Sequence, residues 1–127
     1  MGPQTVVQTA RPDGVRLTVR GRLEGPAVDR LRALLEDAVA AGALVRVDLS
    51  RAEDVPVAVL RALASAHRRL APGPGAVVVE RPSPAARRAL RTSGLDRVLP
   101  VRDARDARDE ARAGAARPAV LGRAARA

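Results

Sequence analysis

Apolar and polar positions alternate along the first part of the chain as they do in a strand. Residues 15–20 read Val-Arg-Leu-Thr-Val-Arg, and residues 5–8 form a shorter extended candidate. Between them, the Arg-Pro-Asp-Gly sequence at 11–14 favours a tight turn. The chain is therefore expected to begin with a β-hairpin, and the glycine-bounded residues 21–25 are expected to form a loop.

The pattern then changes to a helix followed by a buried strand. Pro26 suits the first turn of a helix, apolar residues recur at helical spacing after it, and Gly42 is a typical C-terminal cap. Residues 44–49, Leu-Val-Arg-Val-Asp-Leu, are more continuously apolar than the first strands. This second pattern predicts a strand near the centre of a sheet.

The same alternation continues toward the C-terminus. Pro56 is expected to open a second helix, which ends before the Pro-Gly-Pro-Gly sequence at 72–75. Residues 76–79 are rich in β-branched side chains and predict another strand. Ser83 followed by proline predicts the start of a third helix, ending near Gly94. A short apolar segment over 95–101 can close the core.

Strands that alternate with helices predict an α/β fold with largely parallel pairing. We expect a mixed, mostly parallel sheet of four or five strands, with an N-terminal hairpin and helices mainly on one face. This domain should occupy residues 1–101. Residues 102–127 are rich in Arg, Ala and Asp and are expected to form a tail that is partly helical or disordered.

Composition limits the chemistry of this domain. The 127-residue chain contains no Phe, Tyr, Trp or Cys, so its core must consist of Val, Leu and Ala. Without Cys there is no disulfide, thiolate metal site or cysteine nucleophile, and the single His67 excludes a histidine-cluster metal site. No cofactor or metal is expected. No apolar run is long enough to span a bilayer and no signal peptide is evident, so the chain is expected to be cytoplasmic.

Catalytic residue patterns are missing. The chain has no nucleophile elbow and no lysine-containing phosphate loop, and the prolines at 72–75 remove amides that could hold a phosphate. Neighbouring carboxylates such as Glu36 and Asp37 diverge on a helix surface. His67 lies beside the apolar face of the second helix, where a boundary histidine with one hydrogen bond is expected. We therefore expect a protein that is not an enzyme.

The formal net charge of +9 raises the alternative of a nucleic-acid or anionic-surface binder. All basic residues are arginine, but they are spread along the chain and alternate with acids. There is also no aromatic side chain on which an exposed base could stack. A solvated surface with many arginines is the favoured interpretation.

Five short stretches carry a further signal: Gly21-Arg22-Leu23-Glu24, Val45 to Ser50, Leu60 to Leu70, Ser83 to Arg88, and Ser93-Gly94-Leu95-Asp96. Each is weakly specific alone. Together, over residues 15–101, they resemble in order and spacing the STAS family, the sulfate-transporter and anti-sigma-factor-antagonist domain.

The resemblance implies a non-enzymatic regulatory module that binds a protein partner. In the family, a kinase-type anti-sigma factor typically docks near the start of the second helix, and phosphorylation of a serine there breaks the interface. Here the residues at the usual Asp-Ser-Ser-Gly positions are Pro56, Val57, Ala58 and Val59. Val57 stands at the serine position and cannot be phosphorylated, so no phosphorylation site is expected there.

Two interpretations of this replacement remain open: the apolar residues fill the core, or they form a docking patch. The candidate partner-binding residues are Glu24, Asp54, Pro56, Val57, Ala58 and Arg61. The partner could be a kinase-type anti-sigma factor or another STAS protein. A further alternative is a nucleotide- or lipid-sensing STAS domain, with a pocket near Glu24 and the starts of the second and third helices. Sequence does not indicate the oligomeric state.

Overall fold

The N-terminal hairpin is present and is longer than its pattern predicts. In the computed structural model, which describes residues 5–103, β1 (Thr5–Arg11) pairs antiparallel with β2 (Gly14–Arg22). Val6 lies opposite Val19, and both side chains are buried against the core. Arg30 Nε donates a hydrogen bond to the Val6 carbonyl oxygen over 3.2 Å, which ties this first strand to the helix that follows.

The five strands follow each other across the sheet in sequence order, β1-β2-β3-β4-β5. β3 (Leu44–Asp54) lies in the middle, as predicted, and pairs parallel with β2 and with β4 (Ala76–Glu80). The short β5 (Val101–Arg102) pairs parallel with β4 and completes the sheet. The predicted fold class, a mixed and mostly parallel sheet with an antiparallel hairpin, is confirmed.

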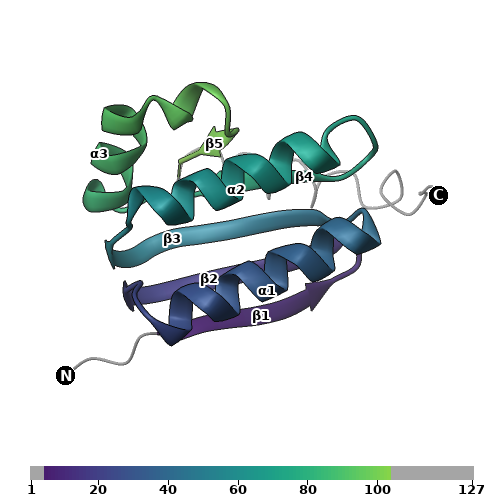
Figure 1. Ribbon diagram of the computed structural model, residues 1–127, viewed down its shortest axis with the longest axis horizontal. Helices are drawn as coiled ribbons and strands as arrows, with labels where there is room; N and C mark the ends of the chain where they lie inside the picture. Colours follow the sequence, from purple (N-terminus) through teal and green to yellow (C-terminus); the bar gives the residue numbers. More distant parts are fainter. Residues whose placement is uncertain (1–4, 104–127) are drawn as a thin grey trace, which may run out of the picture.

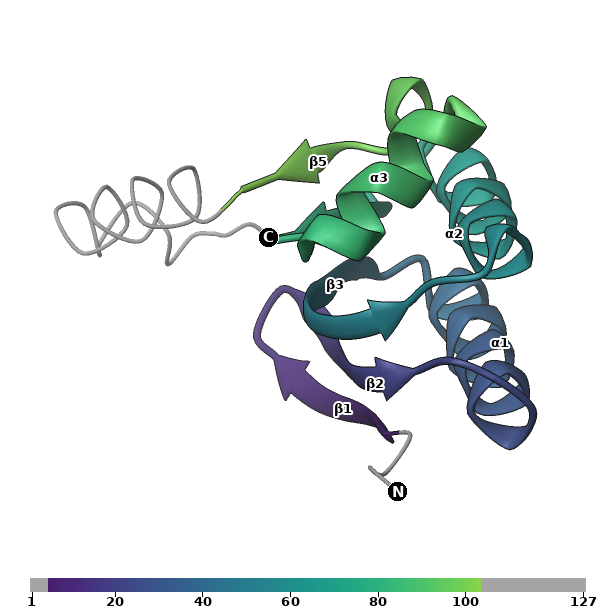
Figure 2. The ribbon, with the colours of Figure 1, turned by 90° about the vertical axis from the view of Figure 1, so that its left-hand side faces the viewer.

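Two long helices cover one face of the sheet. Figures 1 and 2 show α1 (Pro26–Ala41) and α2 (Val57–Leu70) side by side against the strands. α3 (Pro84–Ser93) packs beside the end of β3, and a single 3-10 turn, Leu95–Arg97, leads from it toward β5. Among residues 5–103, no helix has the length and apolar character needed to cross a membrane.

The core lies between the sheet and these helices and is built from Val, Leu and Ala, as the composition requires. Alternate residues of β3 point into it, and Val45, Val47 and Leu49 are fully buried. α3 begins where expected. Ser83 Oγ accepts the Ala86 N–H at 3.1 Å, which caps the helix.

Strand pairing extends β2 and β3 beyond their predicted ends. The expected loop over 21–25 is wrong for its first two residues, because Gly21 and Arg22 pair with Ala52 and Asp54 of β3. The register shifts between Thr18 and Arg20, before this pairing, and between Gly21 and Arg22, within it, which indicates bulges near a glycine of β2. α2 begins at Val57, one residue later than expected, because Pro56 is its N-cap in an extended conformation.

The opposite face of the sheet carries a network of ion pairs. Glu80, only 3% exposed, accepts hydrogen bonds from Arg16 at 2.9 Å and Arg46 at 3.1 Å. Asp48, also 3% exposed, accepts the Ser50 N–H at 2.9 Å and a guanidinium N–H of Arg81. Burial alone would raise the pKa of Asp48, but these hydrogen bonds outweigh it and lower that pKa.

The expected C-terminal tail largely lies outside the described residues. Its first residue, Arg102, belongs to β5 and is therefore part of the domain. The expectation that the rest of the tail is partly helical or disordered concerns residues beyond 103 and stays a prediction.

Candidate functional site

The start of α2 separates the two interpretations left open by the sequence. Val55 and Val59 point inward and are 4% and 1% exposed, whereas Val57 is 43% exposed and Ala58 is also exposed. Val57 and Val7 are the exposed large apolar residues of the described chain. Of residues 56–59, Val59 therefore lies in the core, whereas Val57 and Ala58 lie on the surface.

The first turn of α2 is electrostatically unusual. Its N-cap, Pro56, has no side chain that can accept a hydrogen bond, and no acidic residue occurs in the first turn. The Pro56 carbonyl instead accepts the N–H groups of Val59 at 3.0 Å and Leu60 at 3.3 Å. Free N–H groups and the helix dipole give a helix start partial positive charge. This helix start lacks the local carboxylate or hydroxyl that would normally offset that charge.

Glu24 and Asp54 reach the same end of the sheet from neighbouring parallel strands. The Leu23 N–H donates to the Asp54 carbonyl oxygen at 3.3 Å, which joins the end of β2 to the end of β3. Glu24 and Asp54 are both exposed, and Arg22 Nη2 lies 3.9 Å from Asp54 Oδ2. Carboxyl ends of parallel strands commonly carry binding residues. The structure therefore places Glu24 and Asp54 at the sheet end from which α1 and α2 start.

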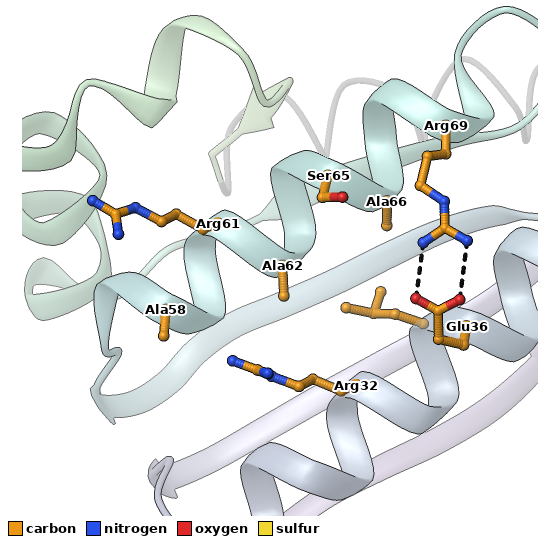
Figure 3. Close-up of a pocket in the computed structure, with 9 residues that line it drawn as sticks. Arg32, Glu36, Ala58, Arg61, Ala62, Ser65, Ala66 and Arg69 are labelled. Atoms are coloured by element: carbon orange, nitrogen blue, oxygen red, sulfur yellow. Dashed lines mark hydrogen bonds and ion pairs between the residues drawn. The ribbon is translucent and has the colours of Figure 1, made fainter.

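Arg61 and Ala58 belong to a shallow groove between α1 and α2, of about 370 Å³. Figure 3 shows this groove with Arg32 and Glu36 contributed by α1. Sequence reasoning missed these two residues, because they lie 26 and 22 positions before Ala58. The four-residue spacing of Ala58, Ala62 and Ala66 was the available signal, since such residues share one side of a helix.

One end of the groove is closed by an ion pair. Arg69 binds Glu36 in a bidentate manner, with Nη1–Oε2 and Nη2–Oε1 distances of 2.8 and 3.0 Å. The hydrogen bonds and charge of Arg69 lower the pKa of Glu36. Because both side chains are exposed, the pair contributes little to the free energy of folding. It links α1 to α2 at this end of the groove.

A second hollow, of about 640 Å³, lies between the strand ends and α3. It borders Asp54 but not Glu24, and its lining mixes charge with small residues: Arg22, Glu53, Asp54, Ala85, Arg88, Ala89 and Thr92. The pocket expected for a ligand-sensing domain required Glu24 as a neighbour. The hollow therefore matches that expectation only at the start of α3.

His67 has the structural role expected from its position. It is half-buried, and its Nδ1 accepts the Val77 N–H at 3.2 Å, linking α2 to β4. An Nδ1 that accepts a hydrogen bond carries no proton, so the ring proton of the neutral imidazole is assigned to Nε2. No group of three His, Asp or Glu residues within residues 5–103 is arranged to hold a metal ion.

Comparison with known proteins identifies the family and the fold. The STAS_2 family model, described as "Mlab, STAS domain", matches residues 6–101. An anti-sigma factor antagonist from Mycobacterium paratuberculosis has a similar structure, with a TM-score of 0.71 and 24% identity over 87% of this chain and 95% of that chain.

Two structures of SpoIIAA are also similar. The unphosphorylated form has a TM-score of 0.69 and 21% identity, over 86% of this chain and 97% of that chain. The phosphorylated form of the Bacillus protein has a TM-score of 0.64 and 21% identity, over 84% and 99% of the two chains. At these identities the likeness establishes the fold. No significant match was found among curated proteins.

Proposed function

Because the chain belongs to the STAS domain family, we propose that it is a non-enzymatic, cytoplasmic regulatory module that binds a protein partner at the start of α2. The partner is a kinase-type anti-sigma factor or another STAS protein. Binding is not switched by phosphorylation at the usual helix start. The observation that carries the proposal is the 43% exposure of Val57 in the first turn of α2.

An exposed valine at this position supports docking, because contact with a partner would remove apolar surface from water. Fully burying a valine side chain stabilises a complex by about 1.5–3 kcal/mol, and roughly half of that remains available here. Ala58 adjoins Val57 and is also exposed. Glu24 and Asp54 at the neighbouring strand ends supply polar groups for the rim of such an interface.

The solved relatives support a regulatory role for this fold. SpoIIAA and the Mycobacterium paratuberculosis protein are anti-sigma factor antagonists, and SpoIIAA has been solved in unphosphorylated and phosphorylated forms. In such a protein a phosphate adds nearly two negative charges to the interface. Val57 has no hydroxyl group, so its surface keeps one charge state, and we infer a constitutive interaction.

The test is an affinity pull-down from native cell extract with three forms of the full chain. Wild type should capture a partner that Val57→Glu loses. Val7→Glu is the matched control, because Val7 is 44% exposed and lies on β1. The control should retain the partner, and circular dichroism should show that all three forms are folded. Equal capture by Val57→Glu and wild type would refute binding at this helix start.

The absence of a phosphorylation switch has its own test. The wild-type protein is incubated with its cognate kinase and analysed by mass spectrometry. Ser50 is exposed and Ser65 lines the α1/α2 groove, so these are the hydroxyls to follow. We expect no stoichiometric phosphate that changes capture. Phosphate on either serine that abolished capture of the partner would contradict the unswitched interaction.

A further inference from the structure

The groove between α1 and α2 has two positive side chains that are not neutralised by neighbours. Its charged lining consists of Arg32, Arg61, Arg69 and Glu36. Glu36 is already paired with Arg69. Among residues 5–103, neither Arg32 nor Arg61 forms an ion pair. The open part of the groove therefore has a net charge of +2.

These two arginines lie on opposite helices at the open part of the groove. Figure 3 shows Arg32 extending from α1 into the space between the helices, while Arg61 extends along α2, away from the Arg69–Glu36 pair. Ala58 lies between them and is exposed. Glu24 and Asp54, the carboxylates near the start of α2, are not among the residues that line this groove. The guanidinium groups of Arg32 and Arg61 therefore favour a negatively charged occupant.

The floor of the groove is apolar and consists of small side chains. Ala58, Ala62 and Ala66 follow one another at intervals of about one helical turn along α2. Ala58 is exposed and Ala62 is half-buried, whereas Ala66 is 3% exposed and lies at the end closed by Arg69 and Glu36. Small side chains at this spacing let another helix approach closely, and its apolar residues could fill the space above them. Val57, the residue before Ala58, is also exposed. The open part of the groove, at Ala58 and Ala62, can therefore contact about one to two turns of a helix.

We propose that this groove holds an acidic amphipathic helix of the protein partner. Its apolar residues, spaced three and four apart, contact the alanine floor and Val57, while Asp or Glu residues along its flanks pair with Arg32 and Arg61. The Arg69–Glu36 pair closes the other end and sets where the bound helix stops. This inference rests on the proposed function and specifies the partner surface that α2 recognises.

Nucleic acid is the competing anionic occupant, and the groove fits it less well. The chain has no aromatic residue for base stacking, and an alanine floor offers no hydrogen bond to a base. Only Arg32 and Arg61 are available for phosphates, and they lie on either side of an apolar strip. An amphipathic helix matches both the strip and the flanking charges.

The first experiment reverses the two charges in the full chain. Arg32→Glu/Arg61→Glu should reduce capture of the Val57-dependent partner at least about tenfold, because acidic flanks would then face like charge. The matched control is Arg11→Glu/Arg97→Glu, which makes the same change in net charge at exposed positions outside the groove. It should capture the partner as wild type does. Both variants are checked by circular dichroism.

The second experiment identifies what lies over the groove. A photoreactive benzoylphenylalanine replaces Ala58, which is exposed at the open end, and the protein is irradiated in native extract. The cross-linked partner peptide should be net acidic, with apolar residues at helical spacing. A basic or neutral peptide, cross-linked nucleic acid, or no cross-link while the partner still co-purifies would overturn the assignment.

The outcomes separate the two proposals. If Val57→Glu loses the partner but the groove charge reversal retains it, the proposed function stands and the acidic-helix assignment fails. If Val57→Glu retains every partner, the proposed function itself fails. Equal losses in the groove variant and in Arg11→Glu/Arg97→Glu would show a general effect of net charge, which also overturns the groove assignment.

Discussion

The opposite orientations of Val57 and Val59 can be tested by stability, independently of any partner. Val59 is 1% exposed within the core, so Val59→Ala removes two buried methyl groups. At about 0.8 kcal/mol for each, and with a cavity left behind, the free energy of unfolding should fall by about 2 kcal/mol. For a domain of this size, the melting temperature should fall by about 10 °C.

Val57→Ala should behave differently, although the two residues are only two positions apart. Val57 is 43% exposed, so its methyl groups lose little contact with the core. Alanine also has a higher helix propensity than valine by several tenths of a kcal/mol, which offsets part of the loss. The expected change in the free energy of unfolding is within about 0.5 kcal/mol of zero.

The assay is urea unfolding followed by far-UV circular dichroism, because the chain has no Trp, Tyr or Phe to report by fluorescence. Linear extrapolation gives the free energy of unfolding of each variant, and equal slopes show that the same surface is exposed. Equal destabilisation by the two substitutions, or a larger effect of Val57→Ala, would refute the arrangement. Such a result would mean that α2 is rotated and that Val57 belongs to the core.

Two further predictions concern Ser83 and Asp48, whose polar side chains are buried. Ser83 Oγ caps α3 and donates a hydrogen bond to the Ala52 carbonyl oxygen at 2.7 Å. Ser83→Ala should therefore lower the free energy of unfolding by about 1–2 kcal/mol and speed hydrogen exchange of the Ala86 amide. Unchanged exchange would contradict the cap. Asp48 has a lowered pKa in the folded protein, where opposing hydrogen bonds outweigh its burial. The stabilising contribution of Asp48 is therefore fully present above the pKa of the unfolded state, about 4, and is lost as the pH falls through the lower pKa of the folded state. Melting curves at several acidic pH values should show a steeper loss of stability for wild type than for Asp48→Asn, and parallel losses would contradict the role of Asp48.

The order of elements could be predicted because local patterns and tertiary structure agree. Proline at helix starts, glycine at helix ends and the apolar run of β3 each indicate the element that forms. The ends of β2 and β3 could not be predicted. Gly21 and Arg22 have loop-like local sequence, and only their pairing with Ala52 and Asp54 keeps them extended. That pairing depends on residues 31 and 32 positions away.

The candidate site was predictable in position but not in shape. The resemblance located the start of α2, yet the residues there allowed Val57 to lie inside or outside, because both valines fit an amphipathic helix. Packing of α2 on β4 and α1 decides which one is buried. Arg32 was missed for a similar reason. It is an ordinary surface arginine along α1, and it becomes part of a groove only through the contact between the two helices.

Under the proposed function, a valine at the family's serine position changes how binding at this surface is controlled. A phosphoserine at a helix start acts by adding charge, so one site can both bind and release a partner. In this chain the local surface is apolar at Val57 and Ala58, and the nearby fixed charges are the guanidinium groups of Arg32 and Arg61. Arginine does not titrate in the physiological pH range, and Val57 and Ala58 have no hydroxyl group to phosphorylate, so the charge of these four residues is fixed. We therefore expect the occupancy of this surface to depend on the concentration and the acidity of the partner. Regulation would then act on the supply or the modification of the partner and not on this domain.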